Sequence, residues 1–124
     1  MIDLTAEQIL REIGEAVGHE TDRLASEIFL YVEIQPAVIS PSMFMDYGEK
    51  VIHHSASERL TFLLYDLWLA DPEAKRWAAM KYIVNDGHFE ALFTYPNEID
   101  PEEDQDDRRD RIVSERYHNK QIIF

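Results

Sequence analysis

The chain alternates apolar and polar residues in several short segments, and this alternation predicts β-strands. Residues 28–35, IFLYVEIQ, place an aliphatic side chain at every second position, as a half-buried strand does. Residues 42–48 form a second such segment, and residues 49–54 favour a short third strand. Pro36 and Pro41 are expected to interrupt the chain between the first two strands, because proline cannot donate a hydrogen bond to a strand ladder.

A β-hairpin is predicted around the turn at residues 85–87, Asn-Asp-Gly, in which glycine supplies the positive φ of a tight turn. The flanking strands are residues 77–84 and residues 88–95. Tyrosine is frequent among the residues that anchor partner proteins. Four tyrosines of the predicted strands and turns are candidates for an exposed sheet face, with core packing as the default for aromatic residues in strands: Tyr31, Tyr47, Tyr82 and Tyr95.

Apolar residues that recur every three or four positions predict two amphipathic helices. Residues 5–18 carry one apolar stripe, with Thr5 as the expected N-cap. Residues 55–71 carry a wider stripe, beginning with a capping box at Ser55 and ending before Pro72.

A third helix is predicted from Asp100, which would be its N-cap, with Glu103 closing a capping box. Two ion pairs are expected on its surface, each worth roughly 0.2–0.5 kcal/mol: Asp104–Arg108 and Asp107–Arg111. Because apolar anchors are few, the first half of this helix should be mostly exposed.

The order helix, strands, helix, hairpin, helix with short connections favours an α+β fold, in which helices pack on an antiparallel sheet. The chain has 124 residues, which fits a single domain over residues 1–124. It has no cysteine, which excludes disulfides, thiol catalysis and cysteine-bound zinc. The N-terminus lacks the basic segment of a signal peptide, and no apolar run is long enough to span a membrane, so neither a signal peptide nor a membrane helix is expected.

The net charge of −13 arises from 25 acidic and 12 basic residues. Such a chain repels nucleic acid and anionic membranes and attracts basic proteins. Acidity that merely keeps the protein in solution is the alternative explanation.

Few residues suggest catalysis or cofactor binding. The histidines lack metal-binding spacing, and the glycines form no phosphate-binding loop, so no metal, cofactor or catalytic residue is predicted. Three carboxylates within apolar patterns are the candidates for acid–base chemistry: Glu33, Asp46 and Asp66. Such chemistry needs a carboxyl in an apolar pocket. We expect a solvent-facing or sheet-edge position for each instead.

Several motifs in a fixed order give the chain a family resemblance. They are IFLYVEI, SMFMDYG, a leucine-rich helix, Trp77, the turn NDGHF at residues 85–89, FTY at residues 93–95, an acidic segment, and ERY at residues 115–117. This order resembles the YezG-like immunity proteins over roughly residues 5 to 118. The resemblance implies a small cytoplasmic protein that is made beside a secreted toxin. It would bind the toxin's C-terminal domain, in many cases a nuclease, and block it without catalysing a reaction.

The predicted partner-binding residues follow the hairpin. They are Tyr95, Glu98, Asp100, Glu102, Glu103, Asp104, Asp106 and Asp107. Glu98 and Asp106 are the sharpest candidates, because neither has a local cap or ion pair to explain it. The expected partner is therefore a basic toxin domain. The alternatives are an acidic regulatory module or nucleic-acid mimic that acts on another basic protein, and a small enzyme that uses a buried carboxylate. The oligomeric state stays open.

Overall fold

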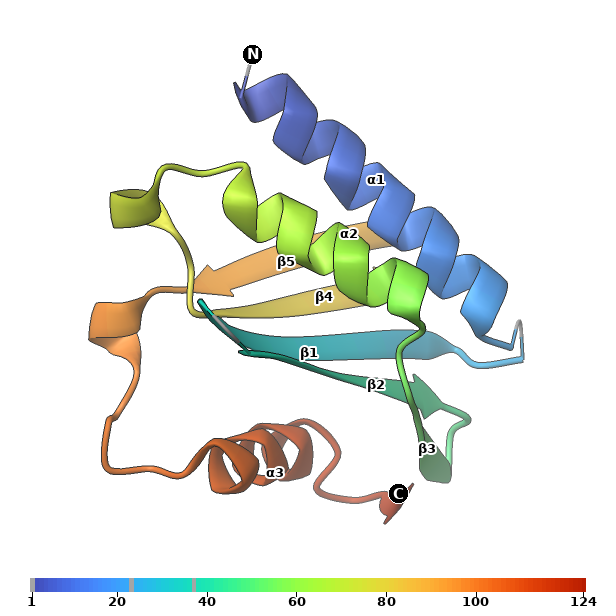
Figure 1. The fold of residues 1–124 in the computed structure, drawn as a ribbon. Coiled ribbons are helices and arrows are strands. Elements are labelled where there is room, and N and C mark those ends of the chain that lie inside the picture. The colour runs from blue at the N-terminus through green and yellow to red at the C-terminus, as the bar shows by residue number, and fades with distance from the viewer. Residues whose placement is uncertain (1, 23, 37) are drawn as a thin grey trace.

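The computed structural model describes residues 2–22, 24–36 and 38–124, and its centre is a β-sheet (Figure 1). Its strands are β1 (Glu27–Gln35), β2 (Val38–Asp46), β3 (Lys50–His54), β4 (Ala79–Asn85), β5 (His88–Thr94) and β6 (Gln121–Ile123). Within the described residues these six strands lie side by side in the order β5-β4-β1-β2-β3-β6. Neighbouring strands are antiparallel except β3 and β6.

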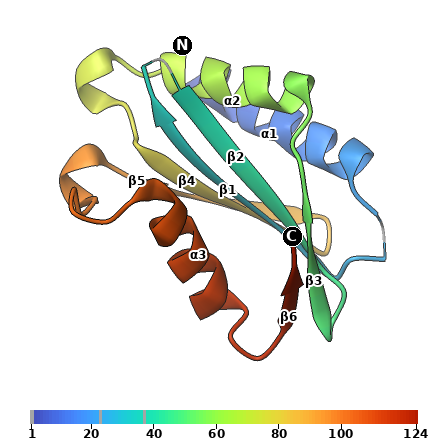
Figure 2. The ribbon, with the colours of Figure 1, turned by 60° about the horizontal axis from the view of Figure 1, so that its bottom comes forward.

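Helices cover both faces of this sheet (Figure 2). α1 (Ile2–Glu20) and α2 (Glu58–Leu69) lie on one face, and α3 (Gln105–Arg116) lies on the other. Two short 3-10 helices, η1 (Glu73–Lys75) and η2 (Pro96–Glu98), lie at the end of the sheet where β1 turns into β2 (Figure 1). The predicted α+β class, with helices packed on a sheet, is confirmed, and the sheet predicted as antiparallel is antiparallel except for the pair β3 and β6. None of the described helices is long and apolar enough to cross a membrane.

The element order differs from the prediction at the C-terminus, where β6 follows α3. This strand pairs parallel to residues 50–52 of β3. It has only three residues, which are too few for an alternating pattern to stand out in the sequence. Ile122 points into the apolar cluster on the α3 face of the sheet, so β6 closes that edge of the core.

The central strand β1 is buried on both faces. Its aliphatic set, beginning at Ile28, packs toward α1 and α2, as alternation predicts. The intervening Phe29 and Tyr31 pack with Phe44 in a second cluster toward α3. β1 lies between two strands and beneath helices on either side, so both sets of side chains leave water. Tyr31 and Tyr82 are both buried, which is the core position expected by default for aromatic residues in strands.

β2 begins four residues earlier than predicted and contains Pro41, which was expected to interrupt it. Pro41 pairs with Val32 of β1. On the other side of β2, β3 pairs only with residues 43–46, so residues 38–42 have no second neighbouring strand among the described residues. Proline is tolerated at such an open edge, because no ladder hydrogen bond is required of it there.

The predicted starts of the first two helices are both displaced. Thr5 lies inside α1, which already includes residue 2, and the N-cap of α2 is Ser57 rather than Ser55. The Ser57 hydroxyl accepts a hydrogen bond from the Leu60 backbone N–H at 3.1 Å. The carboxylate of Glu20, at the end of α1, accepts hydrogen bonds from the Ser57 N–H and hydroxyl. This contact between the two helices selects Ser57 among nearby serines, which local sequence cannot reveal.

The hairpin turn has the predicted geometry. Asp86 and Gly87 both have positive φ, 51° and 77°, as a two-residue hairpin turn of this type requires. In α1, Gly14 lets the sheet approach closely: the buried hydroxyl of Tyr82 donates to the Leu10 carbonyl at 2.8 Å. A Cβ at residue 14 would lie 2.8 Å from that hydroxyl oxygen.

Candidate partner-binding surface

The acidic segment after β5 folds as a turn and a loop before it becomes helical. α3 begins at Gln105 with Asp104 as its N-cap, so the predicted start at Asp100 is wrong. Asp100 closes a turn of its own, since its carboxylate accepts from the Glu102 N–H at 2.9 Å. The Asp104 carboxylate then accepts from the Asp106 N–H at 3.1 Å. Two aspartates four residues apart can each cap a local turn, and local sequence does not show which one starts the helix.

Glu98 also has a local role that the sequence did not reveal. Its carboxylate accepts a hydrogen bond from the Tyr95 backbone N–H at 2.9 Å and so closes η2. Glu98 is therefore no longer among the sharpest candidates for a partner contact. The Tyr95 side chain remains 40% exposed beside this turn.

The predicted ion pairs on α3 are wrong, because its arginines turn toward the sheet and the loop. Arg111 donates two hydrogen bonds to the Glu103 carboxylate, at 2.7 and 2.9 Å. Arg108 donates to the Glu103 carbonyl at 2.7 Å and to the Glu33 carboxylate at 2.8 Å. The hydrogen bond from Arg111 holds the pKa of Glu103 below its ordinary value. Arg108 and Arg111 thus tie the acidic loop to α3, and Arg108 ties both to β1.

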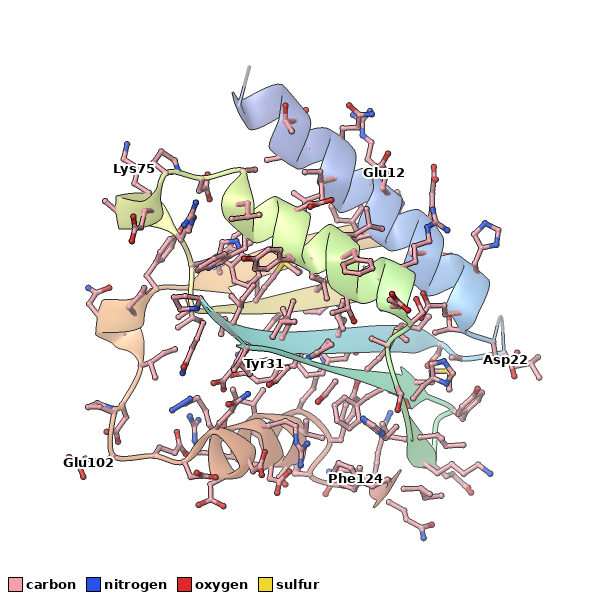
Figure 3. All side chains as sticks on the ribbon, viewed as in Figure 1. Glu12, Asp22, Tyr31, Lys75, Glu102 and Phe124 are labelled. Carbon is pink, nitrogen blue, oxygen red and sulfur yellow. The ribbon has the colours of Figure 1, made fainter. Side chains whose placement is uncertain are left out.

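Glu33 was predicted to face solvent or lie at a sheet edge, yet it is 7% exposed. Its carboxylate accepts from Arg108 and from the Tyr31 hydroxyl, at 2.6 Å for the latter (Figure 3 shows Tyr31 between the sheet and α3). Burial, reinforced by this hydrogen bond, raises the pKa of Tyr31 well above its ordinary value. The position of a glutamate within an apolar strand was the sequence signal for a buried ion pair, because a buried carboxylate requires a cation. The position of that cation was not deducible.

Asp46 is buried as well, at 7% exposure, whereas Asp66 is exposed as predicted. Lys120 donates to both carboxylate oxygens of Asp46, at 2.8 and 2.6 Å, and the Gly48 N–H adds a third hydrogen bond. Burial works to raise the pKa of Asp46, but these hydrogen bonds leave it below its ordinary value. Asp46 and Glu33 are each neutralised by a cation, an arrangement that favours a structural role over proton transfer.

The remaining carboxylates of the segment face water. Among the described residues, the side chains of Glu102, Asp106 and Asp107 have no hydrogen bond or ion pair and are exposed. Asp100 and Asp104 are also exposed, although each accepts one backbone N–H. Figure 3 shows Glu102 at the outer corner of the loop, pointing away from the sheet. The structure therefore gathers five of the eight predicted residues into one exposed acidic surface: Asp100, Glu102, Asp104, Asp106 and Asp107.

A hollow of about 500 Å³ lies beside this acidic surface. The end of β1 forms one wall through Glu33 and Gln35, and the acidic loop forms the other through Pro101 and Glu102. Within the part of the chain that the structure describes, no three histidine, aspartate or glutamate side chains are grouped to hold a metal ion. The exposed carboxylates beside this hollow suit the recognition of cationic groups.

A scan against protein-family models finds no match for the chain, and a search of curated proteins finds none either.

Proposed function

We propose that this chain is a binding protein that neutralises a basic protein partner, and that the partner is the C-terminal domain of a secreted toxin. The observation that carries the proposal is the exposed acidic surface before and at the start of α3. Three of its carboxylates, those of Glu102, Asp106 and Asp107, have no intramolecular partner among the described residues. Unpaired carboxylates on a chain of net charge −13 favour contact with lysine and arginine side chains.

Contacts with the rest of the fold hold the acidic surface in place. The network of Arg108, Arg111, Glu103 and Glu33 joins the loop to α3 and to the central strand. α3 is itself seated on the sheet through Val113, which is 1% exposed. A loop that already has its binding shape loses less conformational entropy on association, so more of the interaction energy remains as affinity.

The acidic surface suits inhibition in which it occupies a basic cleft on the partner. Nuclease domains are the class of partner that offers such a cleft. Long-range attraction would speed the encounter and make the association rate fall with rising salt. We further propose that the protein acts in the cytoplasm of the cell that makes the toxin. The exposed acidic surface supports a basic partner, whereas the choice of a secreted toxin as that partner rests on the resemblance to YezG-like immunity proteins, for which no family model matches.

The second candidate is an acidic regulatory module or nucleic-acid mimic that acts on another basic protein. The same surface supports it, and the neighbouring gene separates the two: a large secreted protein encoded beside this chain favours the toxin inhibitor.

The test is to produce the adjacent toxin domain in cells with and without this chain and to measure growth. The variant Glu102→Gln/Asp106→Asn/Asp107→Asn removes three charges from the acidic surface without changing side-chain size. The matched control, Glu7→Gln/Glu15→Gln/Asp66→Asn, removes three exposed charges from α1 and α2.

We expect the unaltered chain and the control to restore growth and the acidic-surface variant to restore less. Failure of the unaltered chain to protect would refute the toxin-inhibitor function. Equal protection by both variants would place the contact elsewhere on the molecule. Association rates measured at low and high salt provide a second readout, and a rate independent of salt would contradict electrostatic recognition.

A further inference from the structure

An apolar hollow of about 510 Å³ opens at the same end of the molecule as the acidic surface. It lies between the C-terminal end of α2, η1 and the start of η2, on the side where Figure 1 shows both 3-10 helices. The main apolar lining comes from Tyr65, Trp68, Leu69, Trp77 and Pro96. This volume is within the roughly 300–1,000 Å³ of pockets that enclose small organic groups.

The walls of this hollow are held in place by the core. The Trp68 indole N–H donates to the Trp77 carbonyl at 2.8 Å, and the Arg76 guanidinium lies 4.6 Å above the Trp68 ring. Both tryptophans are buried, at 7% and 2% exposure. Leu69 at the rim is 43% exposed, so apolar surface of the hollow is open to solvent. A pre-formed apolar site with one exposed aliphatic wall suits a single inserted side chain.

The apolar hollow adjoins the hollow beside the acidic surface. Both are lined by Ile34 and Gln35 at the end of β1, by Ala78 and by Ile99. The two adjoining hollows are together called the trough, which is apolar at the tryptophans and acidic at Glu102. The same trough thus presents a place for an apolar group and a place for a cation.

We propose that this trough binds an extended basic segment of the partner protein, which inserts one aromatic or aliphatic side chain into the apolar hollow beside Leu69. Lysine or arginine side chains of the same segment then meet the carboxylate of Glu102 and its acidic neighbours. Charge complementarity selects this occupant, because the acidic end disfavours a segment of a second copy of this acidic chain. This inference rests on the proposed function and adds the anchor that gives the contact its specificity.

The test uses the full chain and two short synthetic peptides of lysine, glycine and serine, which are identical except for a central phenylalanine or a central serine. Binding is followed in solution by the indole ¹H–¹⁵N signals of Trp68 and Trp77, the two tryptophans of the chain. We expect the phenylalanine peptide to shift these signals and to bind about tenfold more tightly than the serine peptide.

Two variants of α2 form a matched pair. Leu69→Ser alters the rim of the trough, whereas Phe62→Ser alters a side chain on the same helix that is 60% exposed and lies outside the trough. Leu69→Ser should weaken the phenylalanine peptide about fivefold or more and leave the serine peptide unchanged. Phe62→Ser should change neither. Thermal unfolding of both variants, monitored by circular dichroism, verifies that they fold. Glu102→Gln should weaken both peptides alike.

Equal binding of the two peptides would overturn the apolar anchor while leaving the acidic surface intact. If neither peptide bound, recognition of basic segments at this end of the molecule would be refuted together with the anchor. Self-association in sedimentation that Leu69→Ser abolishes and Phe62→Ser does not would assign the trough to a second copy and overturn the proposal. The growth test of the unaltered chain is independent of all three outcomes, so failure of the function and failure of the anchor are distinguishable.

Discussion

Replacement of Arg108 tests the network that supports the acidic surface. The side chains of Arg108 and Glu33 are only 11% and 8% exposed, so Arg108→Met would leave the Glu33 carboxylate buried without its cation. Breaking a buried pair in this way costs about 3–5 kcal/mol. The hydrogen bond from Tyr31 to Glu33 persists, so we take the lower end, ~3 kcal/mol. For a domain of this size that corresponds to a fall in Tm of about 10 °C.

Urea unfolding followed by tryptophan fluorescence measures the free energy of unfolding. The double variant Glu33→Gln/Arg108→Met removes both charges and should recover more than half of the loss, because no uncompensated charge remains. Arg109→Met is the control: its partner Asp110 is 54% exposed, and removal of such a surface pair costs about 1 kcal/mol at most. Two results would contradict a stabilising role for this network. One is that Arg108→Met lowers the free energy of unfolding no more than Arg109→Met does. The other is that the double variant loses as much as Arg108→Met and Glu33→Gln lose together.

Three further predictions concern the stability of the rest of the fold. Gly14→Ala should destabilise the protein by about 1–3 kcal/mol in thermal melts despite the better helix propensity of alanine, because the new methyl group meets the buried Tyr82 hydroxyl; a gain in stability would contradict the close approach. The pKa of Asp46 is lower in the folded than in the unfolded state. The stabilisation from its pair with Lys120 is therefore complete at pH values above the unfolded-state pKa of about 4, and it is lost as the pH falls through the lower folded-state pKa. The difference in unfolding free energy between the unaltered chain and Lys120→Met should therefore shrink between pH 5 and pH 2, and a constant difference would refute it. Gly87→Ala should cost about 1–3 kcal/mol in urea unfolding, since residue 87 has φ of 77°, and an unchanged midpoint would mean that the turn relaxes.

Much of the fold was predictable because its signals are local. The aliphatic alternation that begins at Ile28 indicated the strand and its face, and the turn at residues 85–87 indicated the hairpin. Helix starts were less predictable. Thr5 and Ser55 are residue types that often cap helices. The start of a helix also depends on tertiary contacts, and the contact of Glu20 with Ser57 joins residues that are far apart in the sequence.

The exposure of the acidic segment was predictable, but the contacts of its individual carboxylates were not. The acidic segment is exposed, as its sequence suggests, but Glu103 and Glu98 are engaged within the protein. Asp107 was assigned to Arg111, which instead contacts Glu103 and, at 3.7 Å, Glu115. Glu103 lies outside the i,i+4 spacing from Arg111, so that spacing could not identify this partner.

The amino-acid sequence by itself determined the α+β class, the order of most elements, the strongly negative charge and the acidic segment after the hairpin. Periodicity and composition express these properties within short windows, so they need no knowledge of the fold. Only the tertiary structure decided which carboxylates are available to a partner. Arg111 engages Glu103, and Arg108 reaches Glu33, 75 residues earlier in the chain, because a buried charge is neutralised by whichever cation the packing brings within reach.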